Sequence, residues 1–62
     1  MNINEQALFQ ALLSHIEVTE KLLEDHIRLV QSLPEFSPSP ALANMLVTIR
    51  SLRQRMQAIV NP

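Results

Sequence analysis

The 62-residue sequence contains no cysteine, no glycine, no tryptophan and no tyrosine. Without cysteine the chain has neither disulfides nor thiolate metal sites, which commonly stabilise a fold of this size. Without glycine it lacks phosphate-binding glycine loops, dinucleotide-binding fingerprints and the commonest tight hairpin turns. Two phenylalanines are the only aromatic residues, which excludes a surface on which successive bases stack. These absences rule out several common classes of ligand-binding site.

Charge and hydropathy predict neither a membrane-spanning segment nor a general affinity for polyanions. The formal net charge is −1, so no overall field attracts nucleic acid or an anionic membrane. No apolar run approaches the roughly 20 residues that span a bilayer. The first residues also lack the basic segment and apolar core of a signal peptide. We therefore expect a soluble, cytoplasmic protein without cofactor or metal.

Proline divides the chain into two helical segments. All four prolines follow residue 33, and the residue before a proline is driven out of the helical region, which predicts a first helix over about residues 4–33. Ser39 followed by Pro40 is a strong helix start, and it predicts a second helix over about residues 40–60. Residues 34–39 then form a proline-rich turn. The expected fold class is all-α, an antiparallel helical hairpin in a single domain of residues 1–62.

The start of the first helix has two interpretations. Asn2 is one N-cap candidate, because Glu5 lies three residues later, at the spacing of a capping box. Asn4 is the other candidate, and it would allow Ile3 to pack on Leu8 as a hydrophobic staple. Both place Glu5 in the first turn, where the helix dipole favours a carboxylate.

Apolar residues cover more of the first helix than one partner helix can bury. One series recurs every seven residues, namely Phe9, Ile16, Leu23 and Val30. A second set lies well round the helix, namely Ala11, Val18, Leu22 and Leu29. The combined arc is roughly 200°, against about 100° for an ordinary surface helix. We therefore expect assembly into a four-helix bundle or a larger helical assembly. The predicted interface residues are Leu8, Phe9, Leu12, Ile16, Val18, Leu22 and Leu29.

The second helix shows a heptad pattern and is shorter than the first. Its two predicted core positions are occupied by Leu42, Ile49 and Met56 and by Met45, Leu52 and Ile59. When the chain folds back at its prolines, the length difference leaves residues 5–12 without a partner in the same chain. This overhang predicts that Phe9 and Leu12 lie in a subunit interface.

The first helix is mainly acidic and the second basic, which supports the antiparallel pairing. Alignment across the turn places Glu20 opposite Arg53 and Glu24 near Arg50. Arg50, Arg53 and Arg55 form the one basic cluster. They either neutralise the acidic flank of the first helix or, doubled in a dimer, contact nucleic-acid phosphates.

Catalytic and metal-binding patterns are missing from the sequence. His15 and His26 lie eleven residues apart, about 16 Å along a helix, so they cannot chelate one metal ion within a chain. Ser14 and His15 are neighbours and point apart on a helix, which does not suit a nucleophile and its base. We therefore expect a protein that is not an enzyme.

In size and layout the sequence resembles the Rop-type plasmid RNA-binding hairpins and the small helical-hairpin chaperones of bacterial secretion systems. The resemblance rests on layout, and no motif residue is shared beyond the cluster of Arg50, Arg53 and Arg55. It implies dimerisation into a four-helix bundle. The sequence thus predicts a homo-oligomeric adaptor, assembly chaperone or regulator that binds a larger protein. The alternative is a dimeric Rop-like hairpin that binds RNA or DNA through the three arginines.

Overall fold

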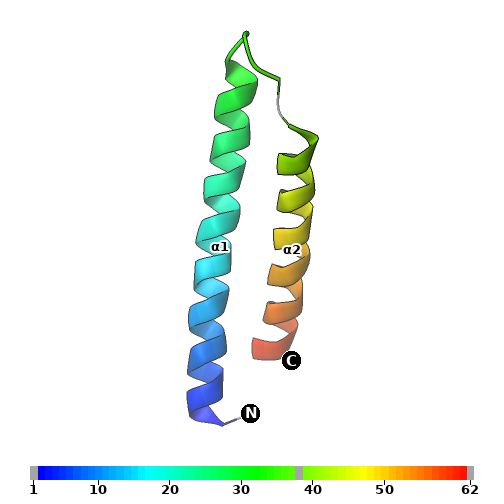
Figure 1. Ribbon diagram of the computed structural model, residues 1–62. Coiled ribbons are helices and arrows are strands. Elements are labelled where there is room, and N and C mark those ends of the chain that lie inside the picture. The colour runs from blue at the N-terminus through cyan, green and yellow to red at the C-terminus, as the bar shows by residue number, and fades with distance from the viewer. Residues whose placement is uncertain (1, 38, 62) are drawn as a thin grey trace.

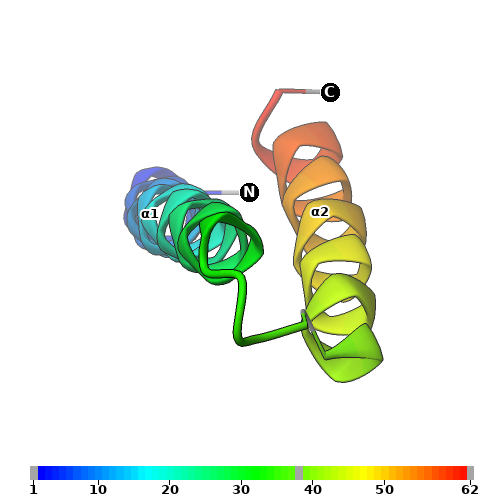
Figure 2. The same cartoon turned by 90° about the horizontal axis from the view of Figure 1, so that it is seen from above.

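The computed structural model describes residues 2–37 and 39–61 as two helices that fold back on each other (Figure 1). Helix α1 spans Ile3–Ser32 and helix α2 spans Pro40–Val60. The helices run antiparallel and pack against each other along α2, which is inclined to α1 (Figures 1 and 2). The predicted all-α hairpin is confirmed, with helix bounds within one residue of those expected. Pro38, within the predicted turn, lies outside the described residues.

Helix α1 begins with a cap formed by Asn2 and Glu5. The Asn2 side-chain oxygen accepts a hydrogen bond from the Glu5 backbone N–H at 2.8 Å, and the Asn2 amide donates to the Glu5 carboxylate at 3.2 Å. The first bond satisfies a backbone N–H that the helix start would otherwise leave without an acceptor, and the second orients the Glu5 side chain. Ile3 is 83% exposed, so the alternative start with a staple between Ile3 and Leu8 is not adopted.

The connection between the helices is set by its prolines. Leu33 has an extended backbone, as expected for a residue before proline, and this ends α1. The Phe36 N–H donates to the Leu33 carbonyl at 3.3 Å, which closes a turn with Pro34 at its second position. Ser39 then caps α2 through its hydroxyl, and Pro40 occupies the first helical position.

The contact between the helices is a single, mostly apolar seam. On α1 the half-buried residues of the seam are Phe9, Leu13, Ile16, Glu20, Leu23, Ile27 and Val30. On α2 the corresponding residues are Leu42, Leu46, Ile49, Arg53, Met56 and Val60. Among the described residues only Met56 and Val60 are buried, at 8% and 6% exposure. A two-helix layer thus forms a seam but encloses no core.

One of the two predicted core positions of α2 is wrong. This position holds Met45, Leu52 and Ile59, whose exposures are 52%, 45% and 45%. Leu46 and Val60, which the sequence predicts to widen the apolar stripe of this helix, do lie in the seam, on the other flank of α2. Apolar residues occur on both flanks of α2, and the flank turned toward α1 is the one nearer to Arg53, which contacts Glu20. The displaced residues then face away from the seam.

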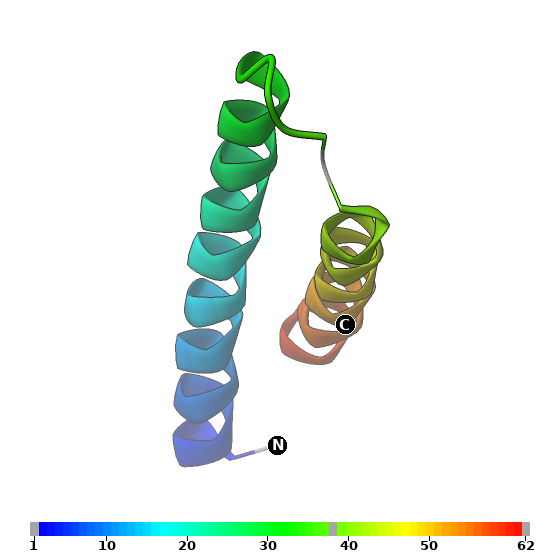
Figure 3. The same ribbon diagram turned by 45° about the horizontal axis from the view of Figure 1, so that its top comes forward.

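The molecule is a rod in which α1 extends past the end of α2 (Figure 3). Its radius of gyration is 14.7 Å, whereas a compact chain of this length has about 11 Å. The overhang is shorter than the predicted residues 5–12, because Phe9 is half-buried on the face that packs against α2. Leu8, at 60% exposure, belongs to the part of α1 that remains uncovered.

Candidate protein-binding surface

One flank of the interhelical seam carries charge pairs between the helices. The Arg53 guanidinium donates from Nε to both carboxylate oxygens of Glu20, at 2.8 and 2.9 Å. The Arg50 guanidinium donates to Glu24 at 3.0 Å. The predicted pairing of Glu20 with Arg53 and of Glu24 with Arg50 is confirmed. We call this flank the ion-pair side, defined by these four residues.

The other flank of the seam is an open, uncharged groove. It has a volume of about 210 Å³, and it is lined by Leu12, His15, Ile16 and Thr19 of α1 and by Ile49 and Leu52 of α2. Helical periodicity places these residues on the flank away from Glu24 and Arg50. We call this flank, together with the exposed Met45 and Ile59, the groove side.

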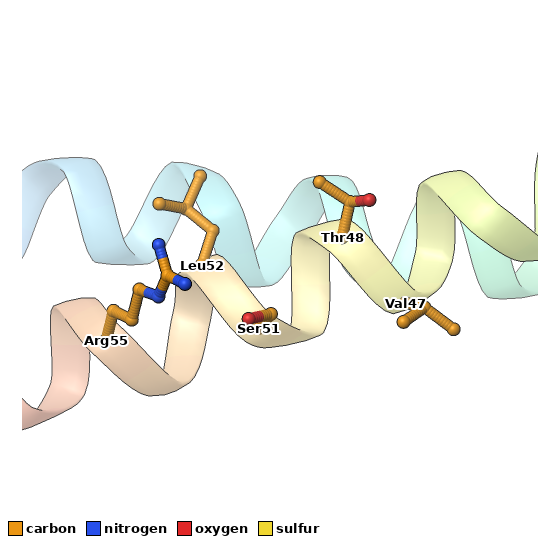
Figure 4. A pocket seen from close by; sticks show the side chains of 5 residues that line it. All are labelled: Val47, Thr48, Ser51, Leu52 and Arg55. Carbon is orange, nitrogen blue, oxygen red and sulfur yellow. The ribbon is translucent and has the colours of Figure 1, made fainter.

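The groove continues along α2 as two further hollows. The first, of about 320 Å³, is lined by Asn44, Met45, Thr48 and Ile49. The second, of about 390 Å³, is lined by Val47, Thr48, Ser51, Leu52 and Arg55 (Figure 4). Shared lining residues join the three hollows into one surface. Figure 4 shows Val47 pointing away from α1, so this residue marks the far edge of that surface.

The two threonine hydroxyls of the groove side are satisfied within their own helices. The Thr19 hydroxyl donates to the His15 carbonyl at 2.8 Å, and the Thr48 hydroxyl donates to the Asn44 carbonyl at 3.0 Å. Such a hydroxyl can be buried without losing its hydrogen bond. The groove side therefore behaves as an apolar surface with respect to a partner.

A second exposed apolar surface lies on α1 alone. It consists of Ala11, Val18, Leu22 and Leu29, and we call it the outer stripe. Val18, Leu22 and Leu29 are 59%, 64% and 59% exposed. At 100° per residue the outer stripe lies roughly 90° further round α1 than the residues of the groove. It faces away from α2.

The predicted interface residues divide between these surfaces. Exposed residues among them are Leu8, Leu12, Val18, Leu22 and Leu29, whereas Phe9 and Ile16 are half-buried against α2. Sequence reasoning missed Met45 and Ile59, because it assigned them to the seam. The pairing of Glu20 with Arg53, which the sequence also predicts, was the signal that could have placed them on the groove side.

The three candidate nucleic-acid-binding arginines are not equivalent. Arg50 and Arg53 face carboxylates of α1, which reduces the positive potential that a phosphate would meet. Arg55 lies beside the hollow shared with Leu52 and makes no ion pair with any residue in the described ranges. Among these three arginines, one guanidinium without an ion pair to the described residues gives only a small positive patch.

We accordingly expect generic duplex RNA and DNA to show no measurable binding at about 150 mM salt, where few phosphate contacts give weak affinity. Fluorescence anisotropy over a salt series checks this, with Arg55→Ala as the test variant and Arg28→Ala, exposed on α1, as its control. Tight binding with a steep dependence on log[salt] that Arg55→Ala alone abolishes would instead establish the nucleic-acid alternative.

Within residues 2–37 and 39–61, no three His, Asp or Glu side chains are grouped so that they could hold a metal ion. Neither of the two helices described is long and apolar enough to cross a membrane. No family model matches this chain, and no curated protein or solved structure matches it significantly.

Proposed function

We propose that this chain is a small non-enzymatic helical protein of the cytoplasm that self-assembles and works by binding a larger protein. Its role would be that of an adaptor, an assembly chaperone or a regulator. One observation carries the proposal. Among the described residues two side chains are buried, whereas twelve large apolar side chains are at least 40% exposed.

The energetic argument follows from the size of the chain. Burying an exposed Leu, Ile or Met stabilises by about 1.5–3 kcal/mol, whereas a small domain is stable by only a few kcal/mol in total. A hairpin with no enclosed core therefore gains most of its stability from further helix packing. A four-helix bundle, or a larger helical assembly, provides that packing.

The outer stripe is suited to an amphipathic helix of the larger partner. Val18, Leu22 and Leu29 recur at spacings of four and seven residues, as do the anchors by which helices recognise each other. On one flank of the stripe, Asp25 pairs with Lys21 at 3.7 Å and with Arg28 at 3.2 Å. These charges would remain in water at the rim of such a contact.

Substitution of Leu22 by Asn should weaken binding of the larger partner by about tenfold or more, because it places an amide at the centre of an apolar contact. Val47→Asn is the matched control, since Val47 is 65% exposed and Leu22 is 64% exposed. Proteins recovered from the native host with the wild-type chain would be purified and tested against each variant by calorimetry.

The two variants carry the same new residue, so their helix propensities are equal, and circular dichroism confirms that both fold. A partner that binds wild-type and Val47→Asn proteins equally but is lost with Leu22→Asn supports the proposal. If every recovered protein binds both variants with unchanged affinity, the outer stripe is not the partner site.

A further inference from the structure

The hairpin exposes more surface than a compact chain of its mass. Its accessible surface is 4815 Å², whereas a folded monomer of 7.1 kDa has about 4,100 Å². The excess of roughly 700 Å² is close to the approximately 800 Å² that each partner contributes to a standard protein interface. One second hairpin therefore matches the area that the single hairpin leaves uncovered.

The distribution of charge on α2 determines which flank a second hairpin can cover. In a four-helix bundle each helix packs against two neighbours, about 90° apart round its axis. On the ion-pair side, a new neighbour would desolvate Arg50 and Arg53 together with their carboxylates, which is costly. On the groove side it would meet Met45, Leu52 and Ile59, which recur every seven residues.

We propose that the groove side of one hairpin packs on the groove side of a second copy of this chain, forming a two-fold, four-helix dimer. This inference rests on the self-assembly proposed above and specifies its interface. The six residues that line the central groove include no charged side chain, so two copies present no like charges to each other. The hydroxyls of Thr19 and Thr48 keep their intrahelical hydrogen bonds when the surface is buried.

This packing leaves the outer stripe outside the bundle. A helix in a four-helix bundle buries the arc that faces its two neighbours, and the outer stripe lies beyond that arc on α1. The dimer therefore carries two outer stripes, one on each copy. A partner with two such helices can occupy both stripes at once. It then binds more tightly than to one stripe alone, because binding of the first helix raises the effective concentration of the second.

Sedimentation equilibrium at about 100 μM, well above a micromolar dissociation constant, tests the interface. The wild-type chain should be a dimer. The double substitution Leu12→Asn and Leu52→Asn, one on each helix of the groove side, should weaken dimerisation by about a hundredfold or more, since each buried amide costs at least tenfold. The matched control is Val18→Asn with Leu29→Asn on the outer stripe, and this variant should remain a dimer.

Cysteine accessibility provides a second measurement that does not depend on a disruptive variant. The chain has no cysteine, so Met45→Cys and Val47→Cys each introduce a single thiol on an exposed position of α2. Alkylation of the thiol at position 45 should slow as protein concentration rises from about 1 to about 100 μM, because dimerisation covers it. Alkylation at position 47 should not change.

The outcomes separate the inference from the proposed function. A wild-type chain that stays monomeric at the highest concentration contradicts both the self-assembly and its interface. A dimer that survives substitution of the groove side but is lost with the outer-stripe variant leaves self-assembly intact and overturns the groove-side interface. Equal alkylation at positions 45 and 47 across the concentration range overturns it as well.

Discussion

Met56→Ala is expected to lower the free energy of unfolding by about 2–3 kcal/mol, the lower part of the range for buried methionine. Met56 is 8% exposed and lies in the seam of α2, between Ile49 and Val60 on the same face. Its truncation removes apolar contacts from the most buried part of the hairpin. Because only two side chains are buried within residues 2–37 and 39–61, this is a large share of the total stability.

Val47→Ala is the control for this substitution. Val47 is 65% exposed and points away from α1, so truncation should change the free energy of unfolding by no more than about 0.5 kcal/mol. Urea denaturation followed by circular dichroism measures both variants at one protein concentration, since stability depends on concentration in an assembling protein. Equal effects of Met56→Ala and Val47→Ala would show that Met56 is not packed against α1.

Reversing the charge of Glu20 is expected to cost about 2 kcal/mol, and reversing Arg53 at the same time should recover most of that loss. Glu20→Arg removes two charge-assisted hydrogen bonds and places a cation beside Arg53, with Arg50 only 3.8 Å from the carboxylate that is lost. Glu20 is 12% exposed and Arg53 is 26% exposed in their side chains, so water screens the pair only in part. Glu20→Arg with Arg53→Glu restores an attractive pair across the same seam.

The double-mutant cycle isolates this pairwise energy. The matched control is the pair of Lys21 and Asp25, which lies on one helix with side chains 74% and 45% exposed and a separation of 3.7 Å. Its cycle should give less than about 0.5 kcal/mol, as for most exposed pairs. A coupling for Glu20 and Arg53 as small as that of the control would show that the two helices are not aligned in the register described.

The proposed dimer interface depends on how α2 is oriented against α1. The contact between Glu20 and Arg53 turns one flank of α2 toward α1, and it thereby exposes Leu52 and Met45 on the other flank. We expect exchange of the pair to preserve that rotation. The groove side lies on the flank away from these ion pairs, and the six residues that line its central hollow include no charged side chain.

Local chemistry allowed the sequence to predict both helices and the turn. A helix start depends on the residues within one turn of it, and Ser39 followed by Pro40 is such a start. The end of α1 depends on Pro34, which acts on the backbone of its neighbour Leu33. The choice of Asn2 over Asn4 as the N-cap was left open, because both have a short polar side chain at a suitable spacing.

Periodicity also showed that α1 has more apolar surface than α2 can cover. This follows from counting apolar residues round one helix, and it needs no knowledge of the partner. The antiparallel pairing of Glu20 with Arg53 was predictable for a related reason, since a short turn constrains the level at which two helices meet. These features are determined by the residue pattern of each single helix and by the length of the turn.

The tertiary structure established how each helix is rotated about its own axis, although the predicted pairing of Glu20 with Arg53 already pointed to that rotation. On α2 the central series is Leu42, Ile49 and Met56. Met45, Leu52 and Ile59 lie on one side of it, and Leu46 and Val60 lie on the other. Either side could have faced α1. Hydrophobicity is non-directional, so it does not distinguish two apolar flanks of similar size. A directional contact does so, because the guanidinium of Arg53 must meet the carboxylate of Glu20 within hydrogen-bond distance. That contact lies across 33 residues of sequence, and it determines which apolar residues remain on the surface.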